Sequence, residues 1–276
     1  MKVYFTQSCK HLVNSFEQGN FEYKHYPNGE LYVRILDEPR KECYVVGSFP
    51  SPIESLMELC LLLDGLLRLG SKVNLIITYF GYSRHDRVVE KGEAVGLQVV
   101  ANMLKQFKLD DAVVIHPHSE HLQEFFRCRP IMPFFDEALG ENDLIVAPDI
   151  GAVPFASQIA ETCSMDLAYM EKIRVQGKVR VVDVVGEVKG KNALIVDDMI
   201  DQGSTVMEAT KLLLSRGVES VNVYATHGVL SEHAVQRLEI FDLIKNVYVT
   251  DSLPPKQSKK IKVLSLVPVL KEIIGK

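Results

Sequence analysis

Short apolar runs alternate with longer amphipathic stretches from one end of the chain to the other. The runs are rich in β-branched residues and apolar on both faces, a pattern typical of buried strands in a parallel sheet. They begin at Tyr44, Val73, Ala112, Leu144, Ala193 and Val221. The amphipathic stretches between them have the length of helices. Repeated alternation of strand and helix predicts an α/β fold, with mostly parallel sheets flanked by helices on both faces.

The strongest helix signal starts at Ser51. This serine can cap a helix, Pro52 suits the first helical position, and Glu54 can close a capping box. Apolar residues then recur at helical spacing until Gly70, where we expect the helix to end.

Two segments depart from this alternation. Residues 21–35 hold Asn28-Gly29 between two runs of alternating polarity, which predicts a β-hairpin. Residues 135–142 interrupt the apolar strands, and we expect a domain boundary there, between residues 137 and 138. A chain of 276 residues corresponds to between one and two domains, at about 150 residues per domain.

Composition narrows the class of protein. The 31 lysines and arginines against 36 aspartates and glutamates give a net charge of −5, which offers no bulk field for holding nucleic acid. The five cysteines are scattered and odd in number, as in a reduced protein without a disulfide framework. We see no signal peptide and no apolar stretch long enough to span a membrane. We therefore expect a cytoplasmic protein that binds neither nucleic acid nor membrane.

The segment most informative about chemistry lies between residues 193 and 214. A buried strand ends there in Asp197 and Asp198. A polar loop and the expected start of a helix follow, made of Asp201, Gln202, Gly203, Ser204 and Thr205. Glu208 can complete a capping box with Thr205.

This arrangement suits a sugar phosphate. Backbone N–H groups at a helix N-terminus bind phosphate, glycine allows close approach, and the Ser and Thr hydroxyls add donors. Two adjacent carboxylates can accept hydrogen bonds from a vicinal diol. Together these features indicate a site for ribose 5-phosphate. The alternative is an acidic strand-to-helix turn with an ordinary cap.

The string VDDMIDQGST resembles the motif that binds 5-phosphoribosyl 1-diphosphate (PRPP) in the phosphoribosyltransferase fold. Type I phosphoribosyltransferases and ribose-phosphate diphosphokinases (PRPP synthetases) share that motif. Further segments resemble the second family, in its own order: YPNGELYVRI, YFGYSRHDR, VIHPHSEHLQEFF, APDIGA, MEKIR and KVLSLVPVLKEII. The resemblance covers nearly the whole chain. It implies two phosphoribosyltransferase-like domains, residues 1–137 on the ATP side and 138–276 on the ribose 5-phosphate side, with the active site between them.

The expected hairpin tip carries Tyr26, Asn28 and Glu30. An aromatic ring can stack on adenine, while Asn and Glu offer acceptors for its amino group. The plainer interpretation is that Asn28-Gly29 only makes the turn. The resemblance implies that these three residues recognise adenine and that a partner subunit supplies them. The chain would then form a homodimer or a larger homo-oligomer.

A second group of polar residues follows the strand that begins at Val73. Arg84 and Arg87 flank Asp86 there, and arginine side chains suit polyphosphate oxygens. A surface Arg–Asp pair is the alternative. The resemblance implies that Arg84 and Asp86 contact ATP, together with His85, which stands where the family has Gln.

Candidate metal ligands are His116, His118 and His121, which follow another strand. Taken alone they form either a solvated histidine cluster or an incomplete zinc site. The resemblance selects His118 as a Mg²⁺-linked histidine, with Asp149 as its carboxylate partner. Mg²⁺ usually keeps several waters, so few protein ligands are needed.

Lys172 lies just before a polar stretch, residues 173–178, and Arg174 lies within it; we expect this stretch to be mobile. Alone they would indicate a basic loop tip. The resemblance implies a flexible catalytic loop in which Lys172 and Arg174 are the catalytic residues.

The resemblance thus implies an enzyme with Mg²⁺ as cofactor and with ATP and ribose 5-phosphate as substrates, giving PRPP and AMP. One alternative is a type I phosphoribosyltransferase that consumes PRPP. Another is a non-catalytic relative that regulates synthetases. Gly92, Glu93 and Ala94 stand where the family usually has an Arg-x-Pro sequence that helps bind a regulatory anion. This departure predicts activity without phosphate activation.

Overall fold

The computed structural model describes residues 1–38, 40–50, 53–175 and 178–275, with side chains left undescribed from 172 to 182. The described chain divides into two compact units. The first contains Met1–Ile131, Ser252–Pro254 and Leu266–Lys276, and the second contains Met132–Asp251 and Pro255–Ser265.

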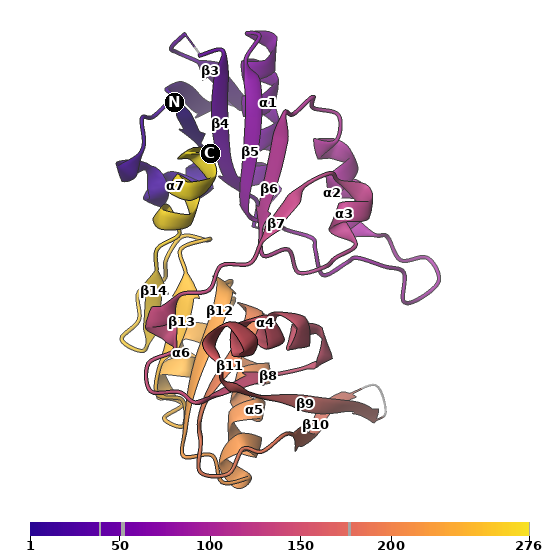
Figure 1. Ribbon diagram of the computed structural model, residues 1–276. Coiled ribbons are helices and arrows are strands. Elements are labelled where there is room, and N and C mark those ends of the chain that lie inside the picture. The colour runs from indigo at the N-terminus through magenta and orange to yellow at the C-terminus, as the bar shows by residue number, and fades with distance from the viewer. Residues whose placement is uncertain (39, 51–52, 176–177, 276) are drawn as a thin grey trace. The chain divides into compact units, whose positions relative to one another are not determined.

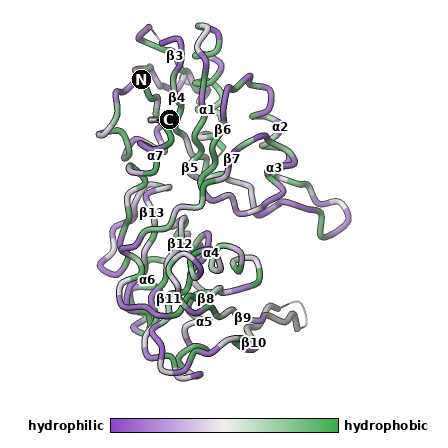
Figure 2. Tube along the Cα trace, in the orientation of Figure 1, coloured by the Kyte–Doolittle hydropathy of each residue, from purple (hydrophilic) through white to green (hydrophobic). Residues whose placement is uncertain are grey.

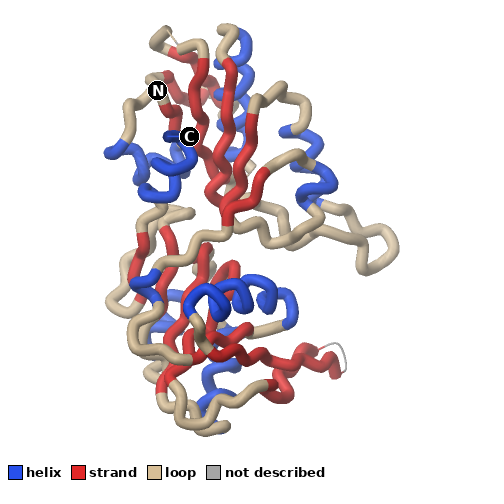
Figure 3. The backbone as a smooth tube through the Cα atoms, viewed as in Figure 1, coloured by secondary structure: helices blue, strands red, loops and turns tan. Residues whose placement is uncertain are grey.

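The first unit is built on a parallel sheet with the strand order β1-β4-β5-β6-β7. Its strands are β1 (Val3–Phe5), β4 (Glu42–Ser48), β5 (Lys72–Tyr79), β6 (Asp111–Ile115) and β7 (Arg129–Ile131). Its helices are η1 (Gln7–Ser15), α1 (Glu54–Arg68), α2 (Gly96–Leu104), α3 (Leu122–Phe125) and α7 (Val267–Gly275), and Figure 3 shows them against the strands.

The sheet of the first unit is covered on both faces. Ile77 of β5 shares one apolar core with the buried leucines of α1 and α2. Its neighbour Thr78 points to the other face, where its Oγ1 lies 3.4 Å from Sγ of Cys9 on η1. Successive residues of a strand alternate between faces, so an apolar run such as Leu75–Ile77 buries both.

The predicted helix after Ser51 runs from Glu54 to Arg68, while Ser51 and Pro52 lie outside the described residues. Its end is confirmed. Gly70 adopts a φ of +78°, and its N–H donates to the carbonyl of Leu67 over 3.0 Å. Glycine takes this left-handed conformation without steric cost.

The predicted hairpin is also confirmed, as β2 (Phe21–His25) paired antiparallel with β3 (Leu31–Ile35). Its loop runs from Tyr26 to Glu30, and Gly29 adopts a φ of +88°. Phe21, Val33 and Ile35 pack against the apolar core of the first unit, so the hairpin is anchored at its base.

The second unit holds a larger sheet with the order β10-β9-β8-β11-β12-β13-β14, parallel except for the edge strand β10. Its strands are β8 (Leu144–Ala147), β9 (Asp166–Val175), β10 (Lys178–Val185), β11 (Asn192–Ile200), β12 (Ser220–Gly228), β13 (Val247–Thr250) and β14 (Ile261–Leu264). Short 3-10 helices at η2 (Asp136–Ala138) and η3 (Ile150–Ala152) accompany α4 (Val153–Cys163), α5 (Ser204–Ser215) and α6 (Ala234–Ile240), as Figure 1 shows.

Helices cover both faces of this sheet too. Ile195 of β11 packs in the core formed with α5 and α6, whereas Leu194 and Val196 pack in the core formed with α4. Figure 2 shows apolar positions along the central strands of each unit, as the sequence pattern predicts. The predicted α/β fold with mostly parallel sheets is therefore confirmed.

The two units divide differently from the expected boundary between residues 137 and 138. The first continuous segment of the first unit ends at Ile131, and Ser252–Pro254 and α7 return to that unit from the C-terminal part of the chain. In Figure 1 α7 lies beside the N-terminal segment of that unit. Leu266, Leu270 and Ile273 are buried there, which explains the return, since an amphipathic helix must cover its apolar face.

All five cysteines are free thiols. Burial raises the pKa of the Cys43 and Cys60 thiols to about 11, which keeps them protonated at neutral pH. Within the described residues, no helix combines the length and the apolarity that crossing a bilayer requires.

Candidate active site

The loop that follows β11 forms the N-terminus of α5. Asp197 and Asp198 belong to β11, and α5 begins at Ser204 with Gly203 as its N-cap. The predicted capping box between Thr205 and Glu208 is therefore wrong.

Gly203 is the N-cap for a steric reason. It adopts a φ of +80°, and a Cβ on it would lie 3.3 Å from a methyl carbon of Leu238. A residue with a side chain would be strained in that backbone conformation and crowded against α6.

The loop presents backbone donors. At the start of α5, the Met207 N–H donates a hydrogen bond to the Gly203 carbonyl over 3.1 Å. The N–H groups of the preceding helical residues have no intrahelical acceptor, because the helix begins there. Ser204 is exposed and Thr205 half-buried, so two hydroxyls lie beside these N–H groups. Such a helix N-terminus binds an anion well.

Three carboxylates interact at the carboxyl ends of two neighbouring strands, β8 and β11. Burial, followed by the charges of Asp198 and Asp149, raises the pKa of Asp197 well above its usual range. One oxygen of Asp197 accepts the backbone N–H of Asp198 over 2.9 Å. Asp149 caps η3 by accepting the Ala152 N–H over 3.2 Å. Hydroxyl donors or a cation would relieve the repulsion among these groups.

In the first unit, one hydrogen bond joins the segment 79–87 to the segment 114–126. The Ser119 hydroxyl donates to Oδ2 of Asp86 over 2.8 Å, and the backbone N–H of His121 donates to the same hydroxyl over 3.2 Å. Asp86 is half-buried, whereas Arg84 and His85 are exposed. The segment 79–87 thus offers a fixed carboxylate beside side chains that are open to solvent.

The arginine–aspartate pair considered as an alternative is loose. Nε of Arg87 lies 3.8 Å from Oδ1 of Asp86, and the Arg87 side chain is 73% exposed. An exposed pair at this distance contributes little to stability. Asp86 is therefore positioned by Ser119 more than by Arg87.

The three candidate histidines occupy different environments. His116 is buried, with a φ of +37° and its N–H donating to the Ile131 carbonyl over 2.8 Å. His118 is exposed. Nδ1 of His121 lies 2.8 Å from Oε1 of Glu124, which raises the pKa of His121. Within the described chain, no set of three His, Cys, Asp or Glu side chains converges on a metal-sized site.

The expected Mg²⁺ ligands belong to separate units. His118 lies in the first unit and Asp149 in the second. In the second unit, Asp149, Asp197 and Asp198 concentrate negative charge, although they do not converge on a metal-sized site within the described residues.

At the hairpin tip, Asn28 has the structural role that its sequence suggests. Its Oδ1 accepts the Glu30 N–H over 3.2 Å, closing the loop. Tyr26 is 45% exposed, and its ring meets the Tyr32 ring edge-on at 5.6 Å. The tip therefore presents an exposed aromatic ring and the exposed carboxylate of Glu30.

The backbone of Lys172 and Arg174 belongs to β9, where it pairs with Val181 and Val179 of β10. Within the stretch expected to be mobile, residues 173–175 and 178 are strand residues, and Gln176 and Gly177 lie outside the described residues. The sequence of β10 is rich in valine, which favours a strand.

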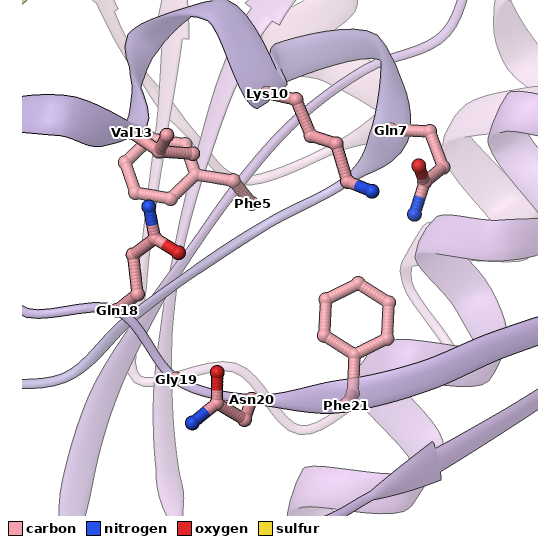
Figure 4. A pocket seen from close by; sticks show the side chains of 8 residues that line it. All are labelled: Phe5, Gln7, Lys10, Val13, Gln18, Gly19, Asn20 and Phe21. Atoms are coloured by element: carbon pink, nitrogen blue, oxygen red, sulfur yellow. The ribbon is translucent and has the colours of Figure 1, made fainter.

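The first unit also has a cavity of about 290 Å³ between η1 and the start of β2 (Figure 4). Its lining includes Phe5, Lys10, Asn20 and Phe21. None of the predicted site residues lines it, so this cavity is not part of the site described above.

Two family models match the chain. The N-terminal domain of ribose phosphate pyrophosphokinase matches residues 5–107, and the phosphoribosyl synthetase-associated domain matches residues 142–276. A ribose-phosphate pyrophosphokinase of Pyrococcus furiosus is 37% identical, with 96% of this chain and 98% of that protein covered. The chain belongs to the ribose-phosphate pyrophosphokinase family.

A further relative and a solved structure point to the same family. The ribose-phosphate pyrophosphokinase of Mycoplasma genitalium is 37% identical, with 96% of this chain and 85% of that protein covered. The crystal structure of phosphoribosylpyrophosphate synthetase from Mycobacterium smegmatis matches with a TM-score of 0.87 and 29% identity, covering 99% of this chain and 97% of that one. The predicted family and its fold, and the expectation of an enzyme, are confirmed.

The sequence analysis of this pyrophosphokinase missed one residue of the site, Ser119. It lies in the segment that carries the candidate metal histidines, and its contact with Asp86 appears only in the folded chain. A serine that follows a strand and accepts a backbone N–H two residues later, as Ser119 does from His121, is the local signal that could have identified it.

Proposed function

We propose that this pyrophosphokinase transfers the diphosphoryl group of ATP to the 1-hydroxyl of D-ribose 5-phosphate, giving PRPP and AMP. The observation that carries the proposal is the β11–α5 loop, where Gly203 caps the N-terminus of α5 five residues after the adjacent Asp197 and Asp198. That combination suits one molecule with a phosphate at one end and a diol at the other.

The ribose 5-phosphate side lies in the second unit. The N–H groups and hydroxyls of Ser204 and Thr205 would hold the 5-phosphate, with Asp201, Gln202 and Gly203 shaping the loop. Asp197 and Asp198 would accept hydrogen bonds from the ribose diol. The raised pKa of Asp197 supports this assignment, since hydroxyl donors would offset the repulsion there.

The ATP side lies in the first unit. Arg84 and His85 are exposed and can reach phosphate oxygens, while Asp86 is fixed by Ser119. Tyr26, Asn28 and Glu30 would recognise adenine from a partner subunit, which makes the active form at least a homodimer. The exposed Tyr26 ring supports stacking on a base.

Mg²⁺ is the cofactor that we propose, held by His118 and Asp149. The interacting carboxylates at the ends of β8 and β11 fit a divalent cation, because they concentrate negative charge beside the phosphate loop. When bound, the cation would supply positive charge to the phosphate oxygens of ATP.

The reaction is an in-line displacement. The oxygen of the ribose 1-hydroxyl forms a bond to the β-phosphorus of ATP, the bond from that phosphorus to the α–β bridging oxygen breaks, and AMP leaves. The hydroxyl proton is released. Lys172 and Arg174 would stabilise the charge that develops on the transferred group, so that catalysis rests on positioning and electrostatics.

An assay with labelled ATP tests this proposal against its alternatives. The proposed enzyme releases AMP only when ribose 5-phosphate is present. A type I phosphoribosyltransferase would consume PRPP, and a regulatory relative would do neither.

We place the enzyme in the cytoplasm, since its five thiols are all free.

A further inference from the structure

The phosphate-binding loop makes a side-chain contact with the segment that precedes α6. Nε2 of Gln202 donates to Oε1 of Glu232 over 3.2 Å. The segment holding Glu232 is fixed at the same end of the sheet, because the Leu230 N–H donates to the carbonyl of Ile200 over 2.9 Å. The Gln202 side chain is therefore engaged by the protein itself.

Glu232 faces an arginine on α6. Nη2 of Arg237 lies 3.9 Å from Oε2 of Glu232, and the Arg237 side chain is 38% exposed. Both Nε and Nη2 of Arg237 are buried, and within the described chain neither has a hydrogen-bond partner. A guanidinium group in that position depends on a nearby anion, and the carboxylate of Glu232 is the one that it faces.

The same helix supports the loop sterically. Leu238, the residue after Arg237, is the side chain that a Cβ on Gly203 would meet at 3.3 Å. One face of α6 therefore lies against the N-cap of α5, while Arg237 balances the charge that Gln202 contacts.

We propose that Gln202, Glu232 and Arg237 form a positioning relay behind the phosphate loop. Gln202 would fix the loop by its bond to Glu232, and Arg237 would neutralise Glu232 so that its carboxylate does not repel an incoming phosphate. In this account the Gln202 side chain positions the loop, and the backbone does the binding. The inference rests on the proposed use of this loop for ribose 5-phosphate.

The charges explain why the neutralisation matters. Glu232 hydrogen-bonds directly to the loop that would receive a phosphate dianion. If the arginine were removed, the carboxylate would remain with its charge unbalanced, and its repulsion would act on the ligand. Removing the charges of Glu232 and Arg237 together would leave the phosphate loop without an unbalanced charge beside it.

Calorimetric titration of ribose 5-phosphate into the full-length protein in Mg²⁺ buffer tests the relay. We expect Arg237→Met to weaken binding about tenfold and the double variant Glu232→Gln/Arg237→Met to restore it to near the wild-type level. Arg216→Met is the matched control, since Arg216 lies at the far end of α5 and pairs with Asp183. It should bind like the wild type.

A second variant covers the case in which Arg237→Met does not fold. Glu232→Gln changes an exposed side chain and keeps an oxygen for the Gln202 bond, so it should bind ribose 5-phosphate at least as tightly as the wild type. Tenfold weaker binding by this variant would overturn the neutralisation account. Arg237→Met binding that is unchanged, or that the double variant fails to rescue, would overturn it as well.

Steady-state kinetics separate this inference from the proposed function. The relay predicts that Arg237→Met raises the KM for ribose 5-phosphate and leaves the KM for ATP and kcat nearly unchanged. A wild-type protein that binds ribose 5-phosphate but releases no AMP contradicts the proposed function and leaves the relay standing. A wild-type protein that binds no ribose 5-phosphate contradicts both.

Discussion

The hydroxyl of Ser119 donates a 2.8 Å hydrogen bond to the carboxylate of Asp86. Ser119 is buried, and it also accepts the backbone N–H of His121, so its position is fixed. The bond joins the segment proposed for ATP to the segment that carries the candidate metal histidine. It gives Asp86 one orientation before any nucleotide binds.

Ser119→Ala should therefore impair the use of ATP. A hydrogen bond to a charged group contributes about 1.5–3 kcal/mol, which corresponds to roughly a 10- to 100-fold change in kcat/KM. The effect should fall on ATP, with the KM for ribose 5-phosphate little changed. Ser258→Ala is the control, because Ser258 donates a bond of the same kind to Glu239, at 2.8 Å, far along the chain. Equal kinetics for both variants would show that Asp86 needs no such support.

Asp198→Ala should weaken the use of ribose 5-phosphate. The ribose diol loses one charged acceptor, again with a cost of about 1.5–3 kcal/mol. The KM for ribose 5-phosphate should rise and that for ATP should stay nearly constant. Unchanged kinetics would remove Asp198 from the site.

Lys172→Ala should lower turnover and leave substrate binding nearly intact. Losing one donor that acts in the transition state costs about 10²- to 10³-fold in kcat in other enzymes. Lys191→Ala, which removes a half-buried lysine paired with Asp166, provides the comparison. A variant that binds ATP weakly yet turns over normally would make Lys172 a binding residue.

Asp197→Asn should raise the melting temperature at neutral pH. The folded-state pKa of Asp197 lies above its usual value, so the stability linked to its protonated form is present at low pH and is lost as the pH rises through the folded pKa. Asparagine keeps the acceptor for the Asp198 N–H and removes the charge. The gain should therefore shrink as the pH falls.

Melting curves of Asp197→Asn against pH measure this difference. Asp143→Asn is the control, since Asp143 is exposed and accepts the Asn192 N–H over 2.9 Å. A gain for Asp197→Asn that persists undiminished in acid would mean that charge repulsion is not its cause.

The loop at Glu93 should make activity independent of inorganic phosphate. Its carboxylate accepts the N–H groups of Val89 and Glu90 over 2.8 and 3.0 Å, which lowers the pKa of Glu93 and uses donors that a bound anion would need. We expect ADP to inhibit weakly and in competition with ATP. Initial rates across a phosphate titration, with ADP inhibition measured at saturating ATP, check both points. A steep phosphate requirement, or inhibition that survives saturating ATP, would contradict this prediction.

The sequence predicts the fold well because strand and helix patterns are local. Apolar runs such as that at Ala193 mark buried strands, and Gly70 marks a helix end. The N-cap of α5 could not be predicted in the same way. Ser, Thr and Gly all suit a cap, and the left-handed backbone at Gly203, with Leu238 crowding the place of a Cβ, decides among them only after folding.

Contacts between distant residues were beyond the sequence pattern. Ser119 and Asp86 lie 33 positions apart, and Gln202 and Glu232 lie 30 apart, so no periodicity links them. The sequence pattern likewise does not predict that α7 returns to the first unit. An amphipathic pattern shows that a helix covers a core, but not which of two sheets provides it.

Phosphorus NMR of the reaction products tests the central claim most directly. With ATP, ribose 5-phosphate and Mg²⁺, the protein should form AMP and PRPP in equal amounts, because the displacement occurs at the β-phosphorus. Formation of ADP would mean that the γ-phosphoryl group alone is transferred. Either that result, or ATP and ribose 5-phosphate left unconsumed by the folded protein, would contradict the account.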